Sequence, residues 1–143
     1  MSEANKEIVR RFFEEGGNKR NLAVFDEIVV EDFKDHAPMP HPPGRQGLKQ
    51  MLGGFQAALP DMRITVEDLV AEGDRVVARL TVGGTHKGPL MGVPATGKRL
   101  SWTAIHLFRI QGGRIVERWA EADVAGMLRQ LGLVPEAATP SRR

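Results

Sequence analysis

The 143-residue sequence contains no cysteine and no tyrosine, and aromatic residues make up only 6% of it. Without cysteine there can be no disulfide framework, no thiolate nucleophile and no cysteine-based metal site. No apolar run approaches the ~20 residues that span a bilayer. The first residues, MSEANKEIVRR, also lack the apolar core of a secretion signal. These absences predict a cytoplasmic protein with no membrane partner.

A strong excess of charge of either sign is also missing. The formal net charge is only +2, and acids such as Glu67 and Asp68 lie among bases such as Arg63. Nucleic-acid-binding proteins usually gather Lys and Arg on one face, interleaved with aromatic side chains. We therefore expect no nucleic-acid partner. What is present, 41% hydrophobic and 27% charged residues, is typical of one ordinary globular domain.

The apolar pattern changes from a helical period to a strand-like one near Met62. It predicts helices over 3–15, 22–29 and 48–59, then strands over 64–72, 76–82, 100–110 and 115–122, and a last helix over 124–131. The proline-rich run over 38–44 must be a loop. Helices followed by consecutive strands indicate an α+β fold, with a curved antiparallel sheet whose concave face holds the helices and leaves room for a pocket. We expect one domain over 1–135 and a flexible tail over 136–143.

The last two strands form a predicted hairpin around Gly112-Gly113. If these glycines make the whole turn, His106 faces Trp119 and Trp102 faces Asp123. Because side chains alternate between the two faces of a sheet, one face then collects the polar and aromatic groups of the hairpin. These are Trp102, His106, Trp119, Glu121 and Asp123. An apolar wall with a few convergent polar groups is typical of a small-molecule site.

Such a cluster suits general acid/base chemistry. A carboxylate beside indole rings is desolvated, which raises its pKa, and a neighbouring imidazole can hold or relay the proton. Each residue also has a structural alternative. Asp123 precedes the last predicted helix and suits its N-cap, while His106 and the two tryptophans suit the core.

Several stretches of the chain resemble the SnoaL-like polyketide cyclases, also known as ester cyclases, of the nuclear transport factor 2 superfamily. They are Asp35-His36-Ala37-Pro38, Glu72 to Arg79, Gly84 to Gly88, Gly92 to Lys98, Gly113 to Trp119 with Asp123, and Gln130-Leu131-Gly132. The resemblance implies a cone-shaped sheet and a homo-oligomer, dimer or tetramer. It also implies that an aspartate at the end of the last strand enolises a polyketide ester for intramolecular aldol ring closure, without metal or cofactor. Asp123 matches that aspartate.

Two further candidate site residues, Arg79 and His86, each have two possible roles. Arg79 would face Asp68 across a hairpin and form an ion pair, or, as the resemblance suggests, point into the cavity. His86 suits a pocket rim or a solvated loop. His36 is expected at the mouth of the cone and His41 in solvent. The two are not spaced as a helical metal pair, so we predict no metal site.

The leading hypothesis is a cofactor-independent acid/base enzyme acting on a small apolar carbonyl or ester. Asp123 would accept the proton with His106 as its partner, and Trp102 and Trp119 would form the walls. Arg79, His86 and His36 would contact the substrate. The alternatives are a ligand-binding module without turnover, another activity of the superfamily such as an isomerase or epoxide hydrolase, and a dimerisation domain that uses the sheet face bearing Ile105 and Val116.

Overall fold

The computed structural model describes residues 2–37 and 41–133. The N-terminal part consists of α1 (Ser2–Arg11), the π-helix η1 (Phe12–Asn18), α2 (Val24–Ile28), β1 (Val29–His36) and α3 (Gly44–Ala58). The rest consists of β2 (Arg63–Glu72), β3 (Arg75–Thr85), β4 (Arg99–Gln111), β5 (Arg114–Ala122) and α4 (Val124–Gln130). The predicted helices and strands follow one another as expected, except that an unpredicted strand, β1, lies between α2 and α3. The expected tail over 136–143 lies outside the described residues.

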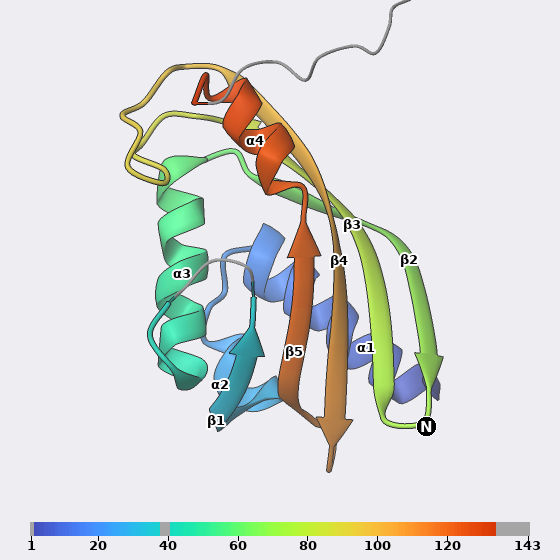
Figure 1. The fold of residues 1–143 in the computed structure, drawn as a ribbon. Coiled ribbons are helices and arrows are strands. Elements are labelled where there is room, and N and C mark those ends of the chain that lie inside the picture. The colour runs from blue at the N-terminus through green and yellow to red at the C-terminus, as the bar shows by residue number, and fades with distance from the viewer. Residues whose placement is uncertain (1, 38–40, 134–143) are drawn as a thin grey trace, which may run out of the picture.

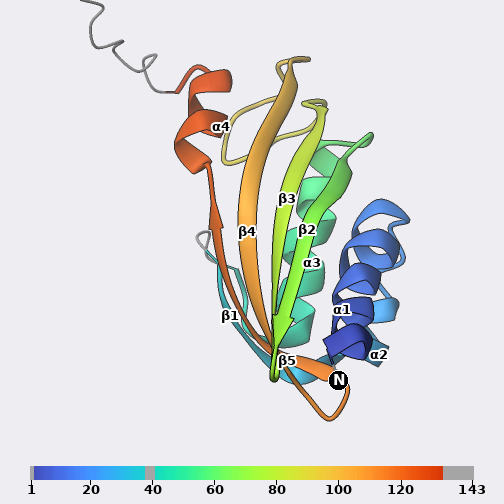
Figure 2. The same ribbon diagram turned by 90° about the vertical axis from the view of Figure 1, so that its right-hand side faces the viewer.

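The five strands form one curved sheet in the order β1-β5-β4-β3-β2. Figure 1 shows the sheet with α1 behind it, and the side view in Figure 2 shows α1, α2 and α3 on one side of the sheet and α4 on the other. The sheet is mixed rather than purely antiparallel, because β1 pairs with β5 in parallel. We did not predict β1, since the charged stretch after Val30 offers only Phe33 as a large buried side chain.

The β4–β5 hairpin contains a β-bulge that the sequence analysis did not include. Ile110 pairs with Ile115 as predicted, but Arg109 pairs with Glu117, so Val116 is an extra residue on β5. The predicted register is therefore wrong beyond the turn. A shift of one residue exchanges the two faces of a strand.

The first helix continues beyond its predicted end at Gly16-Gly17. It widens into the π-helix η1 and ends at Asn18. A Cβ on Gly16 would lie 2.3 Å from Cζ of Phe25, and one on Gly17 would lie 2.6 Å from Cδ1 of Ile64. The two glycines therefore allow η1 to pack closely on α2 and β2 rather than ending the helix.

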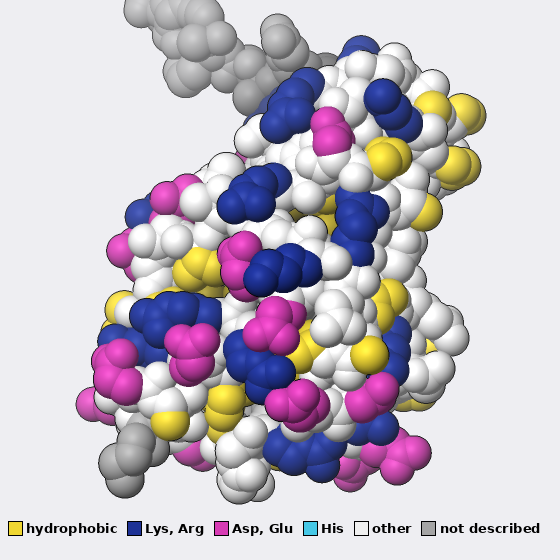
Figure 3. Space-filling view, turned by 180° about the vertical axis from the view of Figure 1, so that it is seen from behind, with side chains coloured by type: hydrophobic (Ala, Val, Ile, Leu, Met, Phe, Trp, Pro, Cys, Tyr) yellow, Lys and Arg dark blue, Asp and Glu magenta, His cyan; other side chains and the backbone are white. Residues whose placement is uncertain are grey.

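The helical face of the molecule carries charges of both signs. Figure 3, seen from behind, shows basic and acidic side chains interspersed rather than separated into patches. Some are paired, as Arg11 is with Glu27 at 2.8 Å and Arg10 with Glu7 at 3.2 Å. Among the described residues, no helix is long and apolar enough to cross a membrane.

Candidate active site

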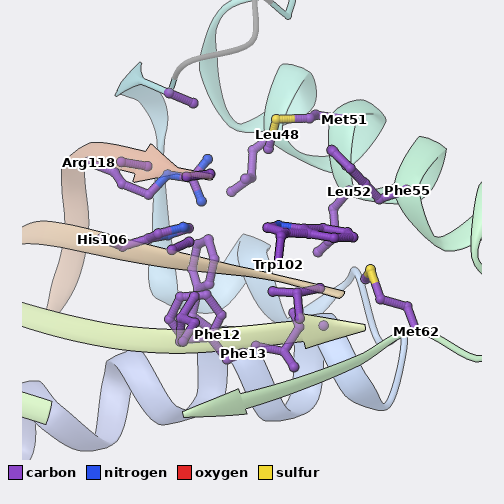
Figure 4. A pocket seen from close by; sticks show the side chains of 18 residues that line it. Phe12, Phe13, Leu48, Met51, Leu52, Phe55, Met62, Trp102, His106 and Arg118 are labelled. Atoms are coloured by element: carbon purple, nitrogen blue, oxygen red, sulfur yellow. The ribbon is translucent and has the colours of Figure 1, made fainter. Parts of the chain in front are cut away.

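A cavity of about 110 Å³ lies between the concave face of the sheet and the helices (Figure 4). The residues lining it are Phe12, Phe13, Gly17, Ala37, Leu48, Met51, Leu52, Phe55, Met62, Ile64, Leu80, Val82, Trp102, Ala104, His106, Arg118, Ala120 and Ala122. All are apolar except His106, Arg118 and the indole N–H of Trp102, and none is a carboxylate. An apolar pocket with a few polar groups is the usual form of a small-molecule site.

His106 lines the cavity from the middle of β4, as predicted. Its Nδ1 is buried and has no hydrogen-bond partner among the described residues. Phe13 approaches the imidazole edge-on, with the ring centroids 5.4 Å apart. Burial, and secondarily the positive charge of Arg118, holds the pKa of His106 well below its ordinary value of 6.5. The imidazole is therefore neutral at pH 7 and free to accept a proton.

Arg118 is the second polar group of the cavity, and the sequence analysis missed it. The bulge at Val116 turns its side chain inward, where it is only 3% exposed. Its Nε donates a hydrogen bond to Oδ1 of Asp35 at 3.0 Å, and its Nη2 donates to Oδ2 of the same carboxylate. This bidentate pairing leaves the Nη1 group to face other partners.

His106 and Arg118 lie diagonally across paired strands. His106 pairs with Ala120, and Arg118 is two residues earlier on β5. Diagonal neighbours of this kind have Cα atoms ~7–8 Å apart, within reach of long side chains. Figure 4 shows both side chains at one end of the cavity, with Trp102 at the other. The cavity thus has a polar end and an aromatic end.

Trp102 lines the cavity as predicted and is almost fully buried. Its ring centroid lies 6.0 Å from that of Phe55 on α3. The two rings form one wall, with Met51 and Leu52 beside Phe55 on the same helix.

Asp123 lies outside the cavity, at the N-cap of α4. Its Oδ1 accepts a hydrogen bond from the backbone N–H of Gly126 at 2.9 Å, and the residue is exposed. This is the capping geometry that was the alternative reading of the sequence. The predicted pairing with Trp102 is wrong because of the bulge. The predicted catalytic role of Asp123 is left as the alternative to a role of His106 as the base.

Trp119 lies on the outer face of the sheet, opposite to the predicted face. It pairs with Leu107 and stacks on His36, with the ring centroids 5.1 Å apart. Nε2 of His36 lies 2.7 Å from Oε2 of Glu117. Neither aromatic ring lines the cavity. The bulge moves Trp119, and the alternation of β1 places His36 beside it.

The remaining predicted contacts also lie outside the cavity lining. Arg79 forms the cross-strand ion pair with Asp68, with Nε 2.6 Å from Oδ2, and more than half of each side chain is exposed. His86 is fully buried, contrary to the reading as a solvated loop residue, and its Nδ1 lies 2.8 Å from Oγ1 of Thr96. His41, expected in solvent, has a side chain only 7% exposed. In residues 2–37 and 41–133, no group of three or more metal-ligand side chains is present.

Little in the sequence signals the role of Arg118. It lies in the run Ile115 to Ala122, where charged residues alternate irregularly with apolar ones. Its buried partner Asp35 is far away in the sequence, on a strand that was not predicted. An arginine is rarely buried without a paired carboxylate, so only the neighbouring strand reveals why Arg118 is tolerated inside.

Comparison with known proteins adds three findings. A family model described as SnoaL-like polyketide cyclase matches residues 7–131. An aklanonic acid methyl ester cyclase from Streptomyces peucetius is 47% identical over 134 residues, which cover 88% of this chain and 89% of the relative. Among solved structures, IdmH from Streptomyces antibioticus is 36% identical with a TM-score of 0.77, covering 90% of this chain and 98% of that one. TsrD from Streptomyces laurentii is 30% identical with a TM-score of 0.83, covering 92% and 96%.

Proposed function

The chain belongs to the SnoaL-like polyketide cyclase family, and from this premise we propose that it closes a ring in a small β-carbonyl ester by an intramolecular aldol reaction. The observation that carries the proposal is the polar end of the cavity. There a neutral imidazole, His106, and a cationic guanidinium, Arg118, face an otherwise apolar space. A base beside a cation is what enolate formation needs.

The proposed reaction conserves all atoms of the substrate. A ring nitrogen of His106 takes a proton from the carbon between two carbonyl groups, and the electron pair of that C–H bond forms an enolate. Arg118 stabilises the enolate oxygen through its Nη1 group. The enolate carbon then attacks a second carbonyl of the same molecule, forming a C–C bond and an alkoxide. The imidazolium returns the proton to the alkoxide, which leaves a cyclic alcohol and neutral His106.

The lowered pKa of His106 selects the kind of carbon acid. A base with a pKa well below 6.5 takes protons efficiently only from acids that are themselves strong for their class. A methylene between two carbonyl groups meets this condition better than that of a simple ketone. The proposal therefore favours β-keto esters, and the names of two cyclase relatives likewise include a methyl ester.

The cavity must widen to hold such a substrate. Its free volume of about 110 Å³ is below the ~300–1,000 Å³ of typical ligand pockets. The α3 side of the cavity is only half-buried at Met51, Leu52 and Phe55. The cavity can therefore widen on this side. Methionine side chains adapt readily to different ligand shapes.

The test is exchange of the α-hydrogen of a β-keto ester for deuterium, followed by NMR, together with ring formation. We expect His106→Gln to lower both rates by about 10²–10⁴-fold, the usual contribution of a general base. Asp123→Asn, which keeps an oxygen for the Gly126 N–H, should leave both rates within about threefold, because the carboxylate lies outside the cavity.

Two outcomes would overturn this assignment. If Asp123→Asn stopped exchange with an unchanged melting temperature while His106→Gln did not, Asp123 would be the base. If ligands raised the melting temperature of the native protein but neither exchange nor product appeared across a panel of β-keto esters, the chain would be a binding module.

We also propose that the enzyme is a homo-oligomer. The outer face of the sheet leaves Ile105 52% exposed, and α1, α2 and α3 all lie on the opposite side of the sheet (Figure 2). Light scattering at micromolar concentration measures the mass in solution. A monomeric mass would contradict the proposal.

A further inference from the structure

We propose that Asp35 and His41 are positioning residues that hold Arg118 in place at the polar end of the cavity. This inference rests on the proposed function of Arg118. Neither Asp35 nor His41 lines the cavity, so each would act only through Arg118.

Asp35 connects two basic groups in the interior. One of its sides takes the bidentate hydrogen bonds of Arg118, and its Oδ2 also lies 2.8 Å from Nε2 of His41. The side chains of Asp35, His41 and Arg118 are 2%, 7% and 3% exposed. A buried charge is tolerated only when it is paired, so the three groups form one interdependent unit.

Both ring nitrogens of His41 face acceptors. Nε2 faces the carboxylate of Asp35, and Nδ1 lies 2.8 Å from the carbonyl oxygen of Pro42. A neutral imidazole has one N–H donor, so it can satisfy only one of these acceptors. In either tautomer the ring lies between the carboxylate that orients Arg118 and the backbone at Pro42.

His41 is itself held in place from the far side. A Cβ on Gly47, near the start of α3, would lie 1.5 Å from the carbonyl oxygen of Pro42 and 3.1 Å from Nδ1 of His41. Only glycine allows this close approach. Four residues before His41, Ala37 already lines the cavity. The hydrogen bond from His41 to Asp35 therefore fastens the chain beside the cavity to the group that orients Arg118.

The test compares His41→Gln with a matched control on the surface. Gln keeps an N–H donor for Asp35 but lacks the second ring nitrogen that faces the carbonyl oxygen of Pro42. The control is Asp26→Asn, because Asp26 likewise joins two basic side chains, Lys49 at 2.7 Å and Arg45 at 3.2 Å, but on the exterior. Stabilisation of the enolate acts in the transition state, so we expect His41→Gln to lower kcat about 10- to 100-fold with KM within about twofold. Asp26→Asn should change neither constant.

A second readout does not depend on turnover. The ¹⁵N–¹H signal of the Arg118 Nε group, identified by its loss in Arg118→Lys, reports the hydrogen bond to Asp35 directly. We expect it to shift and broaden in His41→Gln and to stay unchanged in Asp26→Asn. Asp35→Asn should shift it most, and if that variant does not fold, His41→Gln alone carries the test.

The outcomes separate the two proposals. An Arg118 signal that changes in His41→Gln, in a protein that shows no exchange with any β-keto ester, would overturn the proposed function but not the positioning role. An active enzyme in which His41→Gln leaves kcat and the Arg118 signal unchanged would overturn the positioning role. If His41→Gln lowered the melting temperature but left kcat and the Arg118 signal unchanged, the positioning role would also be overturned. Asp35 and His41 would then have a purely structural role.

Discussion

His106 and Arg118 owe their opposite properties to the same interior. Burial holds the pKa of His106 down, because the imidazolium loses its hydration there and lies near a second cation. Arg118 is tolerated in the same surroundings because Asp35 pairs with two of its nitrogens. The residue facing His106 across the hairpin is Ala120, which offers no carboxylate to stabilise the imidazolium. In the proposed reaction His106 would therefore be a neutral base without an acidic partner.

Supplying the missing carboxylate at position 120 should change the titration of His106. Ala120→Asp places an acid directly opposite His106, and an adjacent negative charge favours the imidazolium. We expect the pKa of His106 to rise towards or above 6.5, measured by NMR titration of its ring protons.

Ala122→Asp is the matched control, since Ala122 also lines the cavity but pairs with Ala104, one inward position further along. It should raise the pKa of His106 less than Ala120→Asp does. Equal effects of the two variants would argue against a direct pairing of positions 106 and 120.

At the scale of elements, the molecule depends on local departures from regular structure. The bulge at Val116 brings Arg118 into the cavity and sends Trp119 to the outer face. The widening of the first helix into η1 places Phe12 and Phe13 against the cavity, and two glycines allow this packing. Both features are single-residue effects on an otherwise regular strand or helix.

The packing of η1 predicts opposite effects for two helical glycines. Gly16→Ala would place a methyl group 2.3 Å from the Phe25 ring, so we expect a loss of about 1–3 kcal/mol in the free energy of unfolding from overpacking. Gly54→Ala, in α3, meets nothing within 4 Å and should stabilise by about 0.5–1 kcal/mol through helix propensity. Urea unfolding measures both. A neutral or stabilising Gly16→Ala would contradict the close packing of η1 on α2.

Most elements were predictable because their apolar periods extend over many residues. The helices over 3–15 and 48–59 and the two hairpins correspond to α1 with η1, α3, β2–β3 and β4–β5. β1 was not predictable, because Asp35 and His36 meet their partners Arg118 and Glu117 only beside β5. The bulge has no signature in Arg114 to Ala122 that distinguishes it from a regular strand.

For the whole molecule, the buried neutral imidazole makes stability depend on pH. The unfolded chain binds a proton at His106 near its ordinary pKa of 6.5, whereas the folded chain binds it only at a clearly lower pH. Between these two values the unfolded state holds more protons, so stability rises with pH and levels off above about 6.5. The contribution is at most about 1.4 kcal/mol per pH unit.

Urea unfolding between about pH 5 and 8 tests this dependence against His106→Gln, which cannot titrate. We expect the native protein to lose stability relative to the variant as pH falls below 6.5. The titration of Glu117 does not change the stability in this pH range. Its pKa is lowered by the hydrogen bond with His36, so its stabilisation is complete above 4.5 and is lost only at more acidic pH. Parallel curves for the two proteins would show that His106 is not buried as a neutral base.

The sequence by itself determined the fold class, the family resemblance and two cavity residues, Trp102 and His106, because each depends on local periodicity or on short motifs. The tertiary structure alone decided which residues accompany them. One extra residue in β5 reverses the face of every side chain after it, and a charge as costly to bury as Arg118 is placed only by a partner distant in sequence, Asp35. The register of a strand and the burial of its side chains depend on the strand with which it pairs. They therefore cannot be predicted from the residues of one strand alone.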